Sequence, residues 1–445
     1  MYFDFDAYLA QIDPFHIWSV QRISGGLVNF TVRAYKVSSS AQDTIQTGLF
    51  DDYQTLILKF APPYIAALGE SAPFSQVRQI VEANALSLFT PPLGPFISLA
   101  QDSSVVVPKL LQHDAENHVL ILEDLGNLPT LSEYLTPLSK RRQSQSDIAI
   151  LHQIGWRLGQ FLADLHSKSA LDTLGTKTLK GFENPSMVKV VRESAVSPIV
   201  KYLEKFDIQD AEQLVQVVTE DFDRDLLDEE KCFTVGDLWT GAILISEADF
   251  NGDVITTNEQ VQSDVDGNEP KLGVIDWEFS GAGAGVNGDM AQLFAHLHLH
   301  LLAAEQGSQL HDITAGLIES IADSYHQRSR LKRAIWTLTD TGQRESLSIS
   351  IAPEESSPAA RIMRSAFVLH GRELVNNAIE RDWTAFSGTS GKRETNLMVR
   401  SMVLTGVWYL RAAKKSVVEF VSAENWKHIC SAKEGSIMMR LLTGI

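Results

Sequence analysis

The spacing of apolar residues predicts a sheet with one helix in the first part of the chain. ISGGLVNFTVRAYKV at 23–37 alternates polar and apolar side chains after a double glycine, and TLILKFA at 55–61 is a short run of leucine and β-branched residues. Both patterns are typical of strands in an antiparallel sheet. Between Pro73 and Phe89 the apolar positions recur at the spacing of a helix that buries one face.

A second pair of apolar runs extends this sheet, and helices dominate the remainder of the chain. The runs at 103–114 and 118–125 predict a hairpin, so the order up to about residue 125 is strand, strand, helix, strand, strand. From Leu151 the pattern is mainly helical, interrupted by two strand-like runs at 233–245 and 271–279. We therefore expect an α+β protein with a sheet-rich unit at 1–125 and a larger, mainly helical unit at 126–445.

Two polar segments of the larger unit predict surface excursions. The stretch near 247–270 is acidic and short of large apolar residues, and we expect it to be a mobile loop. A second loose segment is predicted near 338–358, before the helical pattern that begins near Ala359.

The charge balance weighs against two classes of partner. The chain of 445 residues carries 38 Lys plus Arg and 56 Asp plus Glu, a formal net charge of −18. Proteins that bind nucleic acids through phosphate groups usually carry a basic face, and an anionic membrane repels an acidic surface. We therefore expect no nucleic-acid partner and no membrane partner. Hydrophobic residues make up 44% of the chain, which is enough for a large core.

The cysteine content and the N-terminal sequence point to a cytoplasmic protein. Cys232 and Cys430 are the only cysteines, which is too few for a disulfide scaffold and favours a reducing compartment. The start, MYFDFDAYLAQIDP, lacks the basic and apolar regions of a secretory signal. No apolar run approaches the roughly 18 residues needed to cross a bilayer.

The strongest signal for chemistry lies in GDLWTGAIL at 236–244 and VIDWEF at 274–279. Phosphoryl transfer from a nucleotide requires a carboxylate near the acceptor hydroxyl and an acidic group for the metal that bridges the phosphates. If neighbouring strands bring the segments together, Asp237 is the candidate base and Asp276 the candidate metal ligand. Glu278 faces the same way in an extended chain and is a candidate second ligand. Taken singly, each segment is equally typical of acidic residues beside a turn.

These segments, together with LILKFAPPYIAALGESAPFSQVRQIVEANAL at 56–86, resemble the aminoglycoside phosphotransferase and choline kinase superfamily, and within it the 5-methylthioribose kinases. The resemblance implies a two-lobed, protein-kinase-like fold. It also implies an enzyme that uses ATP and Mg²⁺ to phosphorylate a hydroxyl group of a small-molecule substrate, with a methylthioribose-like sugar as the leading acceptor. Other sugars, choline-like compounds and aminoglycosides stay open as acceptors, and a homodimer stays open as the assembly.

The resemblance also implies which residues contact the phosphates of ATP. Gly25 and Gly26 would form the loop over the phosphates, where glycine permits close approach of the backbone, and Asn29 matches a polar position of that loop. Lys59 matches the lysine that reaches the α and β phosphates, and Glu82 on the following helix is its implied ion-pair partner. On their own, a double glycine is usually a hairpin turn and a strand-end lysine is usually solvated.

The hinge between the lobes and the acceptor side are implied in the same way. VLILEDLG matches the hinge, where the backbone of Glu123, Asp124 and Leu125 would meet the adenine edge. Arg364 matches one arginine of the pair with which methylthioribose kinases touch the sugar. Trp239 is a candidate to pack under a ring-shaped acceptor.

Two positions of the catalytic segment depart from the superfamily pattern His-Gly-Asp with a closing Asn. Val235 stands in the histidine place and Ala242 in the asparagine place, and alanine offers no oxygen to a metal. A degenerate nucleotide-binding pseudokinase is therefore the competing hypothesis. Elsewhere, His296 and His300 have a spacing that can bind zinc, but a packed helix is the simpler interpretation.

Overall fold

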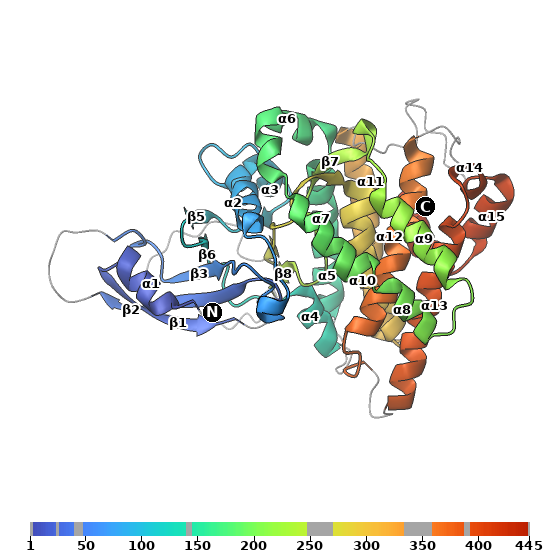
Figure 1. Ribbon diagram of the computed structural model, residues 1–445, viewed down its shortest axis with the longest axis horizontal. Helices are drawn as coiled ribbons and strands as arrows, with labels where there is room; N and C mark the ends of the chain where they lie inside the picture. The colour runs from blue at the N-terminus through green and yellow to red at the C-terminus, as the bar shows by residue number, and fades with distance from the viewer. Residues whose placement is uncertain are drawn as a thin grey trace.

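The N-terminal strands form a five-stranded antiparallel sheet (Figure 1). In the computed structural model, which describes residues 3–23, 26–39, 48–138, 145–246, 270–332, 358–386 and 392–443, the strand order is β1-β2-β3-β6-β5. Leu56 and Leu58 point from β3 into a small apolar core to which α1 contributes. The elements of this region are α1 (Phe5–Ile12), β1 (His16–Arg22), β2 (Phe30–Ser39), β3 (Thr55–Phe60), η1 (Gly69–Ser71), α2 (Val77–Phe89), α3 (Ile97–Asp102), β5 (Leu110–Asp114) and β6 (Val119–Glu123).

The helical part is built around α10 (Ala291–Ala303), whose residues are buried on nearly all sides. A helix without a polar face needs neighbours all round, and α11, α12, α13 and α16 contact it, while α5 packs along α11. The other helices are α4 (Leu131–Leu138), α5 (Gln145–Leu165), α6 (Lys168–Leu179), η2 (Lys180–Phe182), α7 (Pro185–Val191), η3 (Arg192–Val196), α8 (Ile199–Lys205), α9 (Ala211–Asp223), η4 (Asp228–Glu230), η5 (Gly285–Met290), α11 (Gln309–Lys332), α12 (Pro358–Glu380), α13 (Lys392–Ala413), α14 (Val417–Phe420), α15 (Ala423–Ser431) and α16 (Ser436–Thr443).

Two short sheets position the acidic segments. β8 (Ile243–Ile245) pairs antiparallel with β9 (Leu272–Val274), whose other neighbour is β4 (Val105–Val106). β7 (Lys231–Thr234) pairs with β10 (Gly281–Ala284). The loop after β7 and the loop after β9 therefore lie side by side, and Ile275 N donates a hydrogen bond of 2.9 Å to Ala242 O. This confirms the expectation that strands from the two segments are neighbours.

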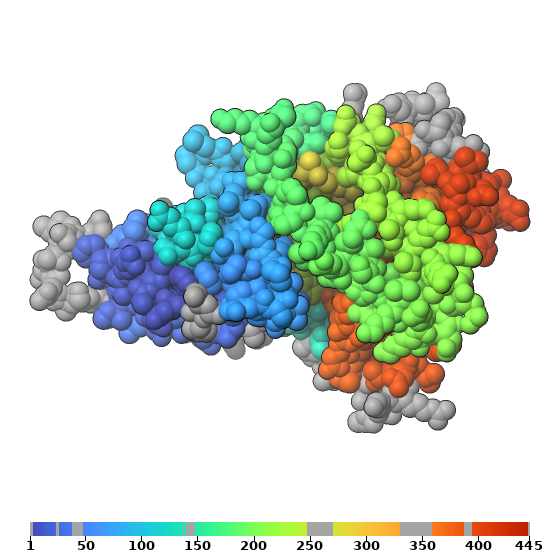
Figure 2. Space-filling model, in the orientation of Figure 1, coloured from blue at the N-terminus to red at the C-terminus, as the bar shows by residue number. Residues whose placement is uncertain are grey.

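Figure 2 shows the N-terminal sheet at one end of an elongated molecule and the last helices at the other. The predicted α+β class is confirmed by the antiparallel sheet and the larger helical part. The division at residue 125 stays a prediction. The two predicted excursions, near 247–270 and 338–358, fall almost entirely outside the described residues. None of the helices in the described ranges is long and apolar enough to span a membrane.

Three details of the N-terminal region differ from the sequence-based expectation. The pattern missed α1 and β1. The helix after β3 begins at Val77 rather than at Pro73, because residues before it are extended, with a bridge from Tyr64 to Pro73 and a hydrogen bond from Phe74 N to Pro63 O. β4 leaves the predicted hairpin and pairs in parallel with β9, so only β5 and β6 form the hairpin.

Candidate active site

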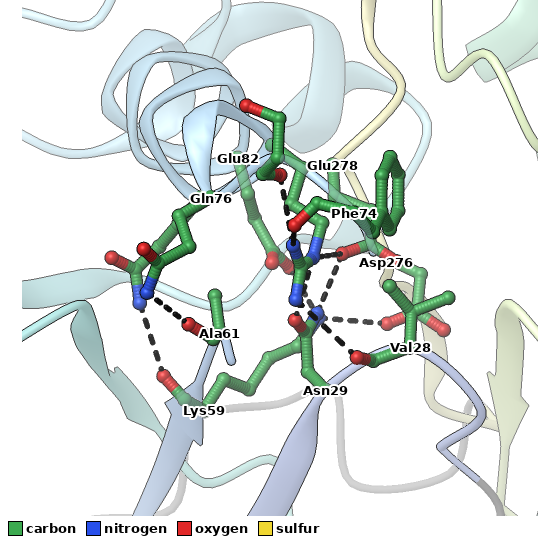
Figure 3. Close-up of polar contacts among 12 residues, drawn as sticks. Val28, Asn29, Lys59, Ala61, Phe74, Gln76, Glu82, Asp276 and Glu278 are labelled. Carbon is green, nitrogen blue, oxygen red and sulfur yellow. Dashed lines mark hydrogen bonds and ion pairs between the residues drawn. The ribbon is translucent and has the colours of Figure 1, made fainter. Parts of the chain in front are cut away.

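Lys59 lies at the centre of the candidate active site (Figure 3). Its Nζ donates to Glu82 Oε1 at 2.7 Å and to Asp276 Oδ1 at 2.9 Å. Burial by itself lowers the pKa of Lys59, but the carboxylates of Asp276 and Glu82 outweigh burial and raise it, so the ammonium group stays charged. One buried cation thus ties together β3, α2 and the loop after β9. The ion pair expected between Lys59 and Glu82 is present.

Asp276 is the accessible carboxylate of this loop. It adopts a φ of +61°, which is uncommon for a residue with a side chain. The buried Trp277 donates its Nε1 to Val274 O at 3.0 Å and so closes the turn behind it. The side chain of Asp276 is 40% exposed, against 7% for Glu278, so Asp276 is the one that a ligand reaches from solvent.

Glu278 is bound by residues of the N-terminal region. Asn29 Nδ2 donates to Glu278 Oε2 at 2.5 Å, and Arg78 Nε donates to Asn29 Oδ1 at 3.0 Å. Burial, opposed by the charge of Lys59, raises the pKa of Glu278 to about 7. In Figure 3 Asn29, Glu278 and Lys59 converge from the glycine loop, the loop after β9 and β3. Sequence reasoning missed Arg78, whose only signal is a basic residue one turn before Glu82.

The donor set of Asp276 and Glu278 fits a magnesium ion. Mg²⁺ is usually held by one or two carboxylates, and phosphate oxygens and water complete its octahedron. Across the described ranges, no group of three or more His, Cys, Asp or Glu could cage a metal. Two carboxylates leave coordination sites of Mg²⁺ for phosphate oxygens and water, so these residues suit an ion that binds together with nucleotide phosphates.

The loop expected over the phosphates packs against the segment after β3. Ala66 N donates to Val28 O at 3.1 Å, and Ala67 N donates to Leu27 O at 2.9 Å. A Cβ on Gly26 would lie 3.2 Å from Asn29 O, so a side chain at this position would crowd the loop. Gly25 lies outside the described residues, and its place in the loop stays a prediction.

The loop that carries Asp237 is braced through its backbone. The carboxylate of Asp289, in η5, accepts hydrogen bonds from Val235 N at 2.7 Å and from Gly236 N at 2.9 Å. Gly236 adopts a φ of +90°, and a Cβ there would lie 1.9 Å from Phe279 O. Val235 thus takes part in bracing through its N–H although it lacks the side chain of histidine. Asp289 was missed because its sequence context, NGDM, shows only a turn.

The electrostatic surroundings of Asp237 suit a proton acceptor. Its Oδ1 accepts a short hydrogen bond from Gln292 Nε2 of α10. Burial, opposed by the hydrogen bond from Gln292 and reinforced by the negative charges of Glu373, Asp276 and Asp289, raises the pKa of Asp237 to about 7. A carboxylate that titrates near neutral pH is matched to general base catalysis. The influence of Asp276 is in line with the close approach of the two acidic segments.

Trp239 lies next to a charged group that the sequence did not reveal. The guanidinium of Arg381, directly after α12, lies 5.0 Å from the centre of the Trp239 ring, and the ring of His296 lies 5.8 Å away. Arg381 Nη2 also contacts His296 Nδ1, so this histidine faces an arginine. The sequence signal for Arg381 is only an arginine at the end of a helix.

Arg364 is not brought to this group. Its Nε donates to Lys415 O at 2.8 Å, beyond the end of α13. Within the described ranges, no hydrogen bond or ion pair joins Arg364 to Asp237 or Trp239. The expected acceptor role of Arg364 therefore lacks structural support, because α12 turns this position toward the C-terminal helices. Arg381 is the arginine beside Trp239.

The predicted hinge connects the sheet with the β8–β9 strands. Glu123 ends β6, and the carboxylate of Asp124 lies 2.8 Å from Arg33 Nε on β2. The side chain of Leu125 lies against Gly273 of β9. The side chains are thus occupied by contacts that hold the connection, and pairing of their backbone with adenine stays a prediction.

The second departure from the superfamily pattern, Ala242, is fully buried. Its N–H donates to Trp239 O at 3.0 Å, and its carbonyl accepts from Ile275 N. This position joins the two segments through the backbone. Asp276 and Glu278 stay the predicted metal ligands.

Comparison with known proteins finds small-molecule kinases. The chain is 26% identical over 262 residues to the 4-hydroxytryptamine kinase of Psilocybe cubensis. The aligned region covers 58% of this chain and 62% of that protein. It is 26% identical over 275 residues to the methylthioribose kinase of Bacillus cereus (strain G9842), 58% of each chain. It is 31% identical over 156 residues to phosphotransferase FrzJ of Cladobotryum sp, 34% of this chain and 37% of the relative. Each match spans less than two thirds of the relative.

No protein-family model matches the chain. Among solved structures, that of spectinomycin phosphotransferase APH(9)-Ia in complex with ADP and spectinomycin aligns with 92% of this chain and 97% of its own, with a TM-score of 0.40 and 12% identity.

Proposed function

We propose that this chain, a member of the aminoglycoside phosphotransferase and choline kinase superfamily, transfers the γ-phosphoryl group of ATP to a hydroxyl group of a small molecule. The observation that carries the proposal is the convergence of Lys59, Glu82 and Asp276 beside Asp237. A buried cation next to an accessible carboxylate suits a polyphosphate, and a second carboxylate of raised pKa suits the acceptor.

Lys59 and the glycine loop would position the phosphates. The ion pair with Glu82 holds the ammonium group, so that little rotamer entropy is lost when a phosphate binds. Asp276 and Glu278 would hold Mg²⁺, which neutralises charge on the phosphate oxygens. Positioning and charge neutralisation supply most of the acceleration of phosphoryl transfer.

Asp237 would act on the acceptor. The acceptor oxygen forms a bond to the γ-phosphorus, the bond from that phosphorus to the β,γ-bridging oxygen breaks, and ADP leaves with that oxygen. The hydroxyl proton passes to the carboxylate of Asp237, which Gln292 orients from α10. The pKa of about 7 lets this carboxylate accept the proton near neutral pH.

The acceptor that we propose first is a methylthioribose-like sugar. A second candidate is a hydroxylated aromatic ring, which is supported by the indole of Trp239 two residues after Asp237 and by the similarity to a protein named 4-hydroxytryptamine kinase. Both candidates present a hydroxyl group to the same base, so the chemistry does not change with the acceptor.

The test is a phosphoryl-transfer screen in which the wild-type chain is compared with Asp237→Asn. We expect transfer to methylthioribose or to a hydroxyindole amine, among acceptors that include other sugars, choline and aminoglycosides. Asp237→Asn should lower kcat about 10²- to 10⁴-fold, since a general base contributes that much. ATP binding, measured by calorimetry, should persist. The melting temperature should not fall, because an amide escapes the desolvation cost that raises the pKa of this carboxylate.

Two results would count against this function. Magnesium-dependent ATP binding without transfer to any acceptor would favour the pseudokinase, in line with Ala242. Full activity of Asp237→Asn would remove Asp237 from the role of base.

A further inference from the structure

Arg78 is a fully buried cation that binds backbone rather than a single counter-ion. Its Nη1 donates to Phe74 O at 3.2 Å and Ser75 O at 2.8 Å, and its Nη2 donates to Pro62 O at 2.7 Å. A longer contact of 3.4 Å joins Nη2 to Val28 O in the glycine loop. One guanidinium therefore holds the glycine loop, the segment after β3 and the start of α2 in one arrangement.

The remaining donor of Arg78 leads to the metal-binding loop. Nε donates to Asn29 Oδ1 at 3.0 Å, and the amide nitrogen of Asn29 donates to Glu278 Oε2 at 2.5 Å. Arg78 Nε is itself 3.9 Å from the same oxygen. Among the described residues, both polar contacts of the Glu278 carboxylate fall on Oε2, so neither of them occupies Oε1.

An aromatic contact joins the same two regions independently. Phe279, the neighbour of Glu278, stacks on Phe74 with ring centres 6.2 Å apart. The guanidinium of Arg78 lies 4.6 Å from the centre of the Phe74 ring. The segment Glu278–Phe279 is thus held by both a polar and an apolar contact to residues that surround Arg78.

We propose that Asn29 and Arg78 are positioning residues that place Glu278 for magnesium and the glycine loop for the nucleotide as one unit. This inference rests on the proposed function and deepens it. Asn29 was expected to act on phosphate directly, whereas its side chain is bound on both ends, by Arg78 and by Glu278. Lysine could not replace Arg78, because it lacks the planar fork that serves several carbonyls at once.

The experiment measures the Mg²⁺ concentration that gives half-maximal ATP binding, by calorimetry, in a double-mutant cycle of Asn29→Leu and Glu278→Ala. Asn29→Leu should raise that concentration about tenfold, the equivalent of one charge-assisted hydrogen bond. In the Glu278→Ala background the same change should alter it less than about twofold, because residues that act through one contact are not additive. Asn29→Ala is a second variant with the same expectation if leucine impairs folding.

Asn84→Leu is the matched control, because Asn84 is an asparagine of α2, the helix that carries Arg78. Its side-chain amide donates to a backbone carbonyl, Gly181 O at 2.8 Å, and not to Glu278. This variant should lower the melting temperature without changing the Mg²⁺ dependence. Equal effects of Asn29→Leu in both backgrounds would overturn the inference and return Asn29 to direct phosphate contact. A wild-type chain that binds no ATP with Mg²⁺ would overturn the proposed function as well, so the two failures are distinguishable.

Discussion

Asp237 is a carboxylate whose surroundings favour its neutral form. Burial is the largest cause of its raised pKa, and the negative charge of Glu373 adds to it. A base must be deprotonated to accept a proton, so activity is expected to rise as the pH passes through the pKa of this group. The pH at which activity rises, the acidic limb of the pH profile, is set by the surroundings of Asp237, since an ordinary aspartate titrates at about 4.

We predict that kcat/KM falls about tenfold between pH 8 and pH 6, because a carboxyl of pKa about 7 is mostly charged at the first pH and mostly neutral at the second. Glu373→Gln should shift the limb to lower pH, since a like charge is removed from its neighbourhood. The check is a pH series of kcat/KM for both proteins. A limb at about pH 4 in the wild type, the range of an ordinary aspartate, would contradict the raised pKa of Asp237.

At the scale of elements, the loop after β7 shows how a short motif acquires its shape. The sequence predicted one strand-like run at 233–245, whereas β7 ends at Thr234 and β8 begins only at Ile243, so the residues around Gly236 form a loop between two strands. The pattern could not show that Phe279 O closes over Gly236 or that Asp289 accepts the two N–H groups of the turn. These contacts join residues that are far apart in the chain, which local periodicity does not record.

We predict that Gly236→Ala lowers the free energy of unfolding by about 3 kcal/mol and activity by at least about 100-fold, through a positive φ and a clash with a carbonyl. Gly307→Ala is the control. Gly307 has a φ of +77° with nothing within 4 Å of an added Cβ, so it should cost only about 1 kcal/mol and leave activity intact. Denaturant unfolding and the transfer assay measure both effects. Equal losses in the two variants would contradict the steric argument.

At the scale of the whole molecule, the helical core encloses ionisable groups that must stay neutral. His298 and His300 of α10 are buried, and burial lowers the pKa of each to about 3. Within the described ranges neither ring nitrogen of His300 has a hydrogen-bond partner, and its ring makes edge contacts with Trp383 and Phe386. Because an unfolded histidine titrates at about 6.5, the unfolded chain binds more protons between about pH 3 and 6.5, and stability is lost as the pH falls through that window.

Between pH 7 and pH 5, the free energy of unfolding should fall by about 2 kcal/mol less in His300→Phe than in the wild type. This difference is the contribution of one histidine that is protonated only in the unfolded chain. Denaturant unfolding at both pH values measures the difference. His311→Phe, which replaces a partly exposed histidine, is the control for the substitution itself. If His300→Phe has the same pH dependence as the wild type, His300 is not a buried neutral group.

The sequence by itself determined the candidate segments, because Asp237 and Asp276 stand in two short motifs flanked by strand patterns, while Lys59 is assigned through the resemblance to a known superfamily. It also determined the α+β class and the long helices, since periodic burial is a local property. Only the tertiary structure decided which groups surround those carboxylates. Asn29 and Glu278 are 249 positions apart, and Arg381 reaches Trp239 from the end of a distant helix. Such contacts depend on how the elements pack, and packing leaves no periodic signal in the chain.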